Sequence, residues 1–137
     1  MKRRTLRGTL TGNEKRRLVV DDGQLTQGYL VKEFHVWSTS LSGGRNAEMV
    51  LSLNEDIALG WRAEDSRQIG WGAMITDAVG DESLNKFSLL DPDHIILRDL
   101  WIQSLNADDA NYMVVLEKIE LTDNQSILTL IKEDRES

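Results

Sequence analysis

The sequence predicts a mainly β protein with an antiparallel, jelly-roll-like β-sandwich fold, and two observations lead to this class. Short apolar runs recur along the chain at intervals of about a dozen residues, and clusters of Gly, Asp and Asn separate them. The 137 residues include no cysteine, so a hydrophobic core rather than a disulfide framework must stabilise the fold. Strands of this length and spacing are typical of sandwiches and barrels, whereas a βαβ fold would show helical patterns between them.

The first pair of strands is expected at residues 16–20 and 28–37, whose apolar runs flank a polar connection at 21–27. Asp22 and Gly23 lie within that connection, and this dipeptide supplies the positive φ angle that a tight hairpin turn needs. The pattern therefore predicts a strand, a turn and a second strand.

Two further strands are expected at residues 48–54 and 67–76, after a Gly-rich break at 41–46. In the second of these strands Gly70 and Gly72 flank a tryptophan. Glycine inside a strand marks a bulge or a close approach of the backbone to a neighbour. We therefore expect one of these two features in this strand.

A polar loop is predicted at residues 77–85, and two long β-like runs follow it, at 94–105 and 111–121. In the first run apolar side chains occupy both faces, interrupted by Arg98 and Asp99. A strand with two apolar faces is covered on both sides, either as a central strand or by a neighbouring subunit. This surplus of apolar surface predicts a homo-oligomer.

The C-terminal segment, residues 122–137, is predicted to form a short helix. Thr122 and Gln125 have the spacing of a capping box at a helix start. The apolar side chains that follow share one helical face and are Ile127, Leu128 and Ile131. Alternation at positions 127, 129 and 131 also suits a strand, so that alternative stays open.

The first 18 residues carry seven basic side chains and one acidic one, a net charge of +6 in a chain whose total is −7. The chain is therefore divided into a basic segment, residues 1–18, and a single sandwich domain, residues 19–137. The basic segment is either an arm that contacts nucleic acid or an acidic protein partner, or an edge strand whose charges discourage mispairing. The residues predicted to make the contact are Lys2, Arg3, Arg4 and Arg7.

No motif in the chain indicates catalysis or metal binding. The two histidines, His35 and His94, lie far apart in sequence. Asp91 and Asp93, beside His94, are typical of a solvated turn rather than of a metal site. The chain also lacks a nucleophile elbow, a glycine-rich phosphate loop and the ligand spacing of a calcium loop. We therefore predict that the protein is not an enzyme and uses no metal or cofactor.

Aromatic side chains are the remaining candidates for function. The four tryptophans are spread over separate segments, and tryptophan favours cores and subunit interfaces because it buries a large area. An exposed aromatic ring on a sandwich can instead stack on sugars, which makes a carbohydrate-binding module the alternative function. The residues predicted to lie in interfaces are Trp37, Trp71, Trp101 and Tyr112.

Four segments between residues 16 and 121 carry a resemblance: RLVVDDGQLTQGYLVKEFHVW, DSRQIGWGAMIT, LLDPDHIILRDLWIQ and NYMVVLEKIEL. In their general character and their order along the chain, these segments are similar to small β-rich structural proteins of bacteriophages, particularly those of marine phages. The resemblance implies a virion component, such as a capsid, capsid-associated or connector-type subunit. Such a subunit would assemble in the host cytoplasm with its own copies and with other virion proteins. No apolar run approaches the roughly 18 residues of a membrane span, so none is predicted.

Overall fold

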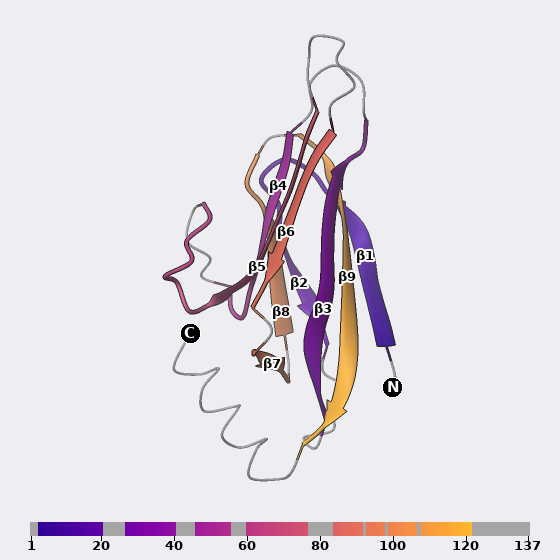
Figure 1. Cartoon of the computed structure of the whole chain (residues 1–137). Coiled ribbons are helices and arrows are strands. Elements are labelled where there is room, and N and C mark those ends of the chain that lie inside the picture. Colours follow the sequence, from indigo (N-terminus) through magenta and orange to yellow (C-terminus); the bar gives the residue numbers. More distant parts are fainter. Residues whose placement is uncertain are drawn as a thin grey trace.

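The computed structural model describes residues 3–20, 27–40, 46–55, 60–76, 84–91, 93–97, 99–106 and 108–121. In these parts of the chain nine strands form two antiparallel sheets that pack face to face, which confirms the predicted β-sandwich (Figure 1). The strands are β1 (Arg3–Leu10), β2 (Lys15–Val19), β3 (Gln27–Ser38), β4 (Asn46–Ser52), β5 (Gln68–Thr76), β6 (Leu84–Leu90), β7 (Ile95–Ile96), β8 (Asp99–Ser104) and β9 (Ala110–Glu120).

The helix predicted at residues 122–137 falls outside the described residues. Within the described parts of the chain, no helix has the length and apolar character needed to cross a membrane.

The first half of the chain pairs with the second half in a nested manner. β1 pairs with β9, β2 with β8, β3 with β7 and β4 with β5. Additional pairing of β3 with β9 and of β4 with β8 joins these ribbons into sheet A (β1-β9-β3-β7) and sheet B (β2-β8-β4-β5-β6). A long hairpin wrapped around a core in this way has the jelly-roll-like arrangement that the sequence predicts. β6 is an additional strand outside this arrangement, and it pairs with β5.

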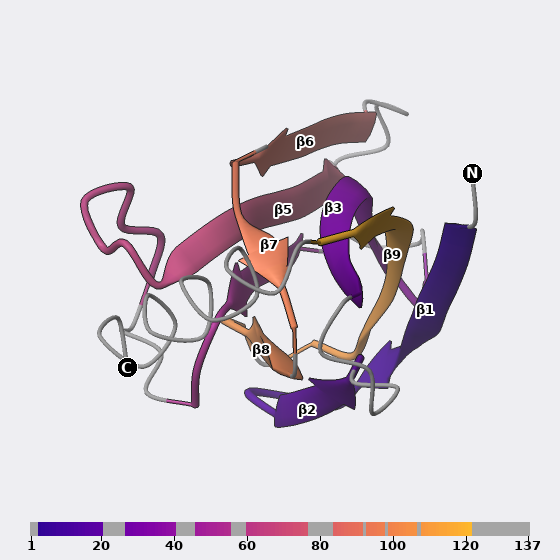
Figure 2. The same cartoon turned by 90° about the horizontal axis from the view of Figure 1, so that it is seen from below.

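The core lies between the two sheets, which face each other in the view along the strands (Figure 2). Burial alternates along the strands: in β8, Leu100, Ile102 and Ser104 are buried while the residues between them are half-buried. One face of each sheet is thereby removed from water, and this apolar burial is the main contribution to stability. The largest fully buried side chains come from both sheets and include Phe34, Met49, Leu51, Ile69, Met74, Ile102 and Leu116.

The prediction made for the glycines of β5 is confirmed. A Cβ atom on Gly72 would lie only 2.7 Å from Val36 Cγ2, so β5 passes too close to β3 for a larger residue. The register between β4 and β5 also shifts between Leu51 and Ser52, opposite Gly70, which is a β-bulge. The bulge and the close approach therefore occur in the same strand.

The prediction of a single long strand at residues 94–105 is wrong, because this segment forms two strands that belong to opposite sheets. β7 ends at Ile96 in sheet A, and β8 begins at Asp99 in sheet B. As the chain crosses between the sheets, the consecutive residues Ile96 and Leu97 are both buried. The crossing accounts for apolar residues on both faces of this segment without a covering subunit.

No strand is expected from the sequence at Leu84–Leu90, yet these residues form β6 at the edge of sheet B. The Ser88 hydroxyl donates a hydrogen bond to the Phe34 carbonyl oxygen at 2.5 Å, which ties β6 to β3 of the opposite sheet. Phe87 and Leu89, the neighbours of Ser88, are largely exposed. Residues 86–89 are all exposed, and Leu90 at the end of the strand packs against the core. β6 therefore lacks the regular burial of alternate residues by which strands are recognised.

Candidate functional site

The first part of the basic segment, residues 3–10, forms an edge strand, because β1 pairs with β9 on one side and with no described strand on the other. Alternation along β1 separates its arginines. The Arg4 guanidinium donates hydrogen bonds to the carbonyl oxygens of Val19 and Val20, each at 3.3 Å, and so links β1 to the end of β2. Arg3 and Arg7 are exposed, and neither makes an ion pair among the described residues. Lys2 lies outside the described residues.

A half-buried polar cluster lies beside β1, at the turn into β2. The Arg16 guanidinium donates to Glu14 Oε2 at 2.7 Å and to the Thr9 carbonyl oxygen at 3.0 Å. Its hydrogen bond with the Tyr112 hydroxyl is the largest influence that raises the pKa of Arg16, and Glu14 adds to it. The Tyr112 side chain is only 3% exposed. It is therefore a core group with almost no surface on which to contact a partner.

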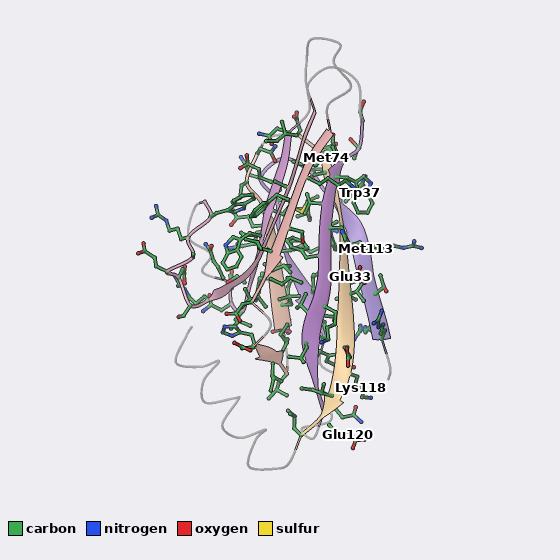
Figure 3. All side chains as sticks on the ribbon, in the orientation of Figure 1. Glu33, Trp37, Met74, Met113, Lys118 and Glu120 are labelled. Carbon is green, nitrogen blue, oxygen red and sulfur yellow. The ribbon has the colours of Figure 1, made fainter. Side chains whose placement is uncertain are left out.

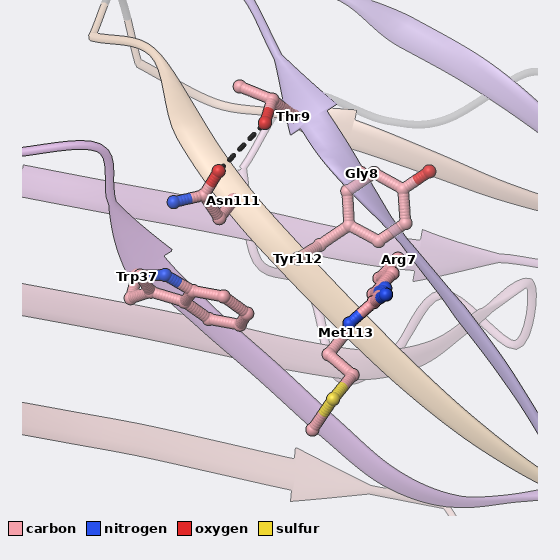
Figure 4. A pocket seen from close by; sticks show the side chains of 7 residues that line it. All are labelled: Arg7, Gly8, Thr9, Trp37, Asn111, Tyr112 and Met113. Carbon is pink, nitrogen blue, oxygen red and sulfur yellow. Dashed lines mark hydrogen bonds between the residues drawn. The ribbon is translucent and has the colours of Figure 1, made fainter.

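The outer face of sheet A carries a shallow, open pocket of about 540 Å³ (Figure 4). The register places Asn111 of β9 between Thr9 of β1 and Trp37 of β3, while Arg7 and Met113 form the next row along the strands. Figure 3 labels Trp37 and Met113, which belong to the neighbouring strands β3 and β9. The pocket is lined by Arg7, Gly8, Thr9, Trp37, Asn111, Tyr112 and Met113.

The polar groups of this pocket are arranged as donors. Thr9 Oγ1 donates to Asn111 Oδ1 at 2.7 Å, and this bond leaves the Asn111 amide nitrogen available as a donor. The Trp37 indole N–H and the Arg7 guanidinium have no acceptor among the described residues. The pocket thus combines an indole and a thioether with unused N–H donors.

The outer face of sheet B carries an apolar patch, which we define as Trp61, Ile75, Phe87 and Leu89. Their exposed fractions are 39%, 48%, 44% and 55% respectively. Phe87 pairs with Ala73 across the β5–β6 hairpin, and Leu89 pairs with Trp71. The ring of Trp61 stacks on that of Phe87, with centroids 5.3 Å apart. The patch is therefore contiguous and lies at the free edge of the sheet.

Trp71 and Trp101, both predicted as interface residues, lie half-buried on the outer face of sheet B. Trp71 borders the apolar patch, and its indole N–H donates to Gln68 Oε1 at 2.9 Å. Trp101 lies further from the patch, on β8, with the Lys15 ammonium 6.0 Å from the centre of its ring. The structure thus separates Trp37 on sheet A from these two tryptophans on sheet B.

The histidines form two separate pairs with acidic residues. His94 Nε2 lies 3.0 Å from Asp91 Oδ2, and His35 Nε2 lies 3.2 Å from Glu33 Oε1. In the described parts of the chain, no three His, Asp or Glu side chains gather in a way that could hold a metal ion. Each pair is a local polar contact at the surface or in a turn.

Comparison with known proteins finds no protein family, no characterised protein and no solved structure that matches the chain. The fold and the two outer faces of the sheets are therefore the basis for assigning a function.

Phe87 and Leu89 of the apolar patch, and Thr9, Asn111 and Met113 of the pocket, are not predicted from the sequence. The first pair belongs to an edge strand in which residues 86–89 are all exposed, although the alternation of Phe87 and Leu89 with polar residues was a usable signal. The other three residues meet Trp37 only through the pairing of β1, β9 and β3, which come from distant parts of the chain.

Proposed function

We propose that the protein is a non-enzymatic structural subunit of a virion, and that it assembles with copies of itself through the apolar patch on sheet B. The observation that carries this proposal is the exposure of Trp61, Ile75, Phe87 and Leu89 together on one face. Contiguous exposed aromatic and aliphatic side chains mark interaction surfaces, because burying them releases ordered water.

The position of the patch suits contact between two copies of the chain. β6 is the last strand of sheet B and has no described neighbour beyond it, so its backbone groups are open to pairing. A two-fold axis along this edge would bring the same patch of each copy together. The chain carries a net charge of −7, so repulsion between copies opposes this contact, and added salt should strengthen association.

The virion part of the proposal draws on two further considerations. The first is the resemblance to small structural proteins of bacteriophages that the sequence suggests, and the second is that jelly-roll sandwiches are used in viral capsids as well as in lectins. Within this proposal the subunit is a capsid, capsid-associated or connector-type component, assembled in the host cytoplasm. Other virion proteins would contact the remaining surfaces.

Sedimentation velocity of the purified chain over a range of concentrations tests self-association. We expect wild type to form a discrete oligomer, and Leu89→Ser and Phe87→Ser to weaken association about tenfold or more. Val19→Ser is the matched control, because Val19 is 51% exposed on the same sheet but lies on β2 at the opposite edge. A wild-type chain that stays monomeric at millimolar concentration would reject self-assembly.

Mass spectrometry of purified virions tests the virion part separately. The chain should be present at a constant ratio to other structural proteins across independent preparations. Its loss on further purification of the particles would contradict the proposal, whatever the oligomeric state of the isolated chain.

A further inference from the structure

The pocket on sheet A lies on the opposite outer face from the apolar patch, and the contact proposed between copies leaves it unused. We infer that this pocket, built by Trp37, Arg7 and Asn111, binds an acidic sugar residue of a polysaccharide. The inference does not rest on the proposed assembly function. It assigns a second, ligand-binding activity to the same subunit.

The geometry of the pocket suits a sugar ring. Thr9, Asn111 and Trp37 form a row across three neighbouring strands, which spans about 10 Å at the usual strand spacing. The indole of Trp37 and the side chain of Met113 give this row an apolar surface. The C–H face of a pyranose ring carries partial positive charge, and it therefore stacks favourably on the electron-rich face of an indole.

The donors of the pocket define the charge of the ligand. The indole N–H of Trp37, the Asn111 amide nitrogen and the Arg7 guanidinium have no acceptor among the described residues, so a ligand that displaces water from them must supply acceptors. Sugar hydroxyl oxygens satisfy the first two donors. A guanidinium pairs best with a carboxylate, to which it donates two parallel hydrogen bonds. A hexuronate ring carries both kinds of acceptor.

The surrounding charges favour a saccharide over nucleic acid. Arg7 is the one cation that lines the pocket, whereas binding to a nucleic-acid backbone relies on several phosphate contacts in succession. Glu33 is on the same outer face and pairs with His35, and Glu117 lies 3.6 Å from Lys32. The Glu117–Lys32 pair carries no net charge, and the Glu33 carboxylate adds negative charge to this face. A single cation in the pocket therefore suits one carboxylate better than a continuous row of phosphates.

Nuclear magnetic resonance of the full chain provides a direct test, because each indole N–H gives its own signal. Trp37→Phe identifies the Trp37 signal by its disappearance. The probe is a galacturonate oligosaccharide, and the matched neutral probe is the galactose oligosaccharide of the same length. We expect the acidic probe to shift the Trp37 signal, and the neutral probe to bind about tenfold more weakly because it lacks the charge-assisted bonds.

Variants separate this site from the rest of the surface. Trp37→Ala should abolish binding of the galacturonate oligosaccharide, and Arg7→Gln should reduce its affinity to that of the neutral probe. Arg3→Gln is the matched control, because Arg3 lies on the same strand outside the pocket. Trp61→Ala removes an aromatic ring from the other sheet, and it should change self-association but not sugar binding.

Four outcomes would overturn the inference. The first is a Trp37 signal that no oligosaccharide shifts, even at millimolar concentration. The second is equal binding of the acidic and neutral probes with no effect of Arg7→Gln. The third is a stronger response to single-stranded DNA or to inorganic phosphate than to the galacturonate oligosaccharide. The last is equal loss of binding in Arg3→Gln and Arg7→Gln, which would indicate general charge attraction.

Discussion

The indole of Trp61 stacks on the ring of Phe87, with ring planes 25° apart and centroids separated by 5.3 Å. The same indole donates its N–H to the carbonyl oxygen of Met49 at 3.2 Å. Trp61 therefore links the segment before β5 to two strands of sheet B, β4 and β6. The stack supports β6, the strand that carries the exposed edge of the apolar patch.

A double-mutant cycle measures the strength of this stack. We expect Trp61→Ala and Phe87→Ala to be coupled by about 0.5–1.5 kcal/mol in the free energy of unfolding, which is typical of paired aromatic rings. Denaturant unfolding at low protein concentration keeps self-association from contributing to the result. Trp61→Ala combined with Val19→Ala, at the far edge of the sheet, should be additive. Coupling of the same size in that control cycle would show that the effect is not due to the stack.

Substitution of the glycines in β5 tests the close approach of the two sheets. Gly72→Ala should destabilise the fold by about 1–3 kcal/mol, because the new Cβ would press on Val36 Cγ2 at 2.7 Å. Gly70→Ala should cost less, since its nearest neighbours are the ends of the Leu51 and Leu90 side chains at 3.0 Å, which can rotate away. Thermal unfolding gives the order, and an equal or larger loss for Gly70→Ala would contradict this account.

Acid should weaken the turn that precedes β5. The side-chain hydrogen bond from Arg67 lowers the pKa of Asp65 below its ordinary value, and Arg67 Nε lies 2.9 Å from Asp65 Oδ1. Because the folded state holds the proton less tightly than the unfolded state, the ionised carboxylate stabilises the fold above a pH of about 4. This contribution is lost as the pH falls through the folded-state pKa.

Asp65→Asn tests this pH dependence through melting temperatures at pH 7 and in acid. At pH 7 the variant should be less stable than wild type by about 1 kcal/mol, and the difference should shrink in acid, where the wild-type carboxyl is protonated too. Glu64→Gln, at an exposed neighbouring position, should show no such convergence. A difference between wild type and Asp65→Asn that persists unchanged in acid would rule out the carboxylate as its source.

The sequence predicts the class of fold because alternation and turn residues are local signals. It predicts the bulge and close approach in β5 for the same reason, since glycine has no Cβ atom to press on the opposite sheet. Local signals do not show where the chain changes sheets, so residues 94–105 looked like one strand. They also fail for β6, where residues 86–89 are all exposed although the Ser88 hydroxyl bonds the Phe34 carbonyl oxygen of the opposite sheet.

The candidate site could be predicted only in part. Trp37 is prominent in the sequence, but Thr9 and Asn111 join it through the pairing of three strands that are distant along the chain. Tyr112 looked like an interface residue because aromatic side chains favour interfaces. Its position in the alternation of β9 places its side chain on the face of the strand that points toward the core and Arg16. Which of the two faces is buried therefore decides its role.

The edge strand formed by the basic segment leads to the last prediction, which compares Arg4 with Arg3. Arg4 spans the open side of the sandwich, from β1 of sheet A to the Val19 and Val20 carbonyl oxygens at the end of β2. Arg4→Gln should therefore lower stability by about 1 kcal/mol, a fall in melting temperature of roughly 3–5 °C. Arg3→Gln removes the same charge from an exposed position and should leave the melting temperature unchanged.

Deletion of residues 1–8 extends this comparison from one side chain to the strand. It removes most of β1 and leaves the backbone groups of β9 without their partner, and it uncovers core residues that Leu6 packs against. We expect a loss of stability larger than that of Arg4→Gln, together with a tendency to aggregate through the exposed edge. A free arm would make no such contribution. Equal melting temperatures for the deletion variant and wild type would therefore show that β1 does not stabilise the sandwich, and would leave contact with a partner as the role of its charges.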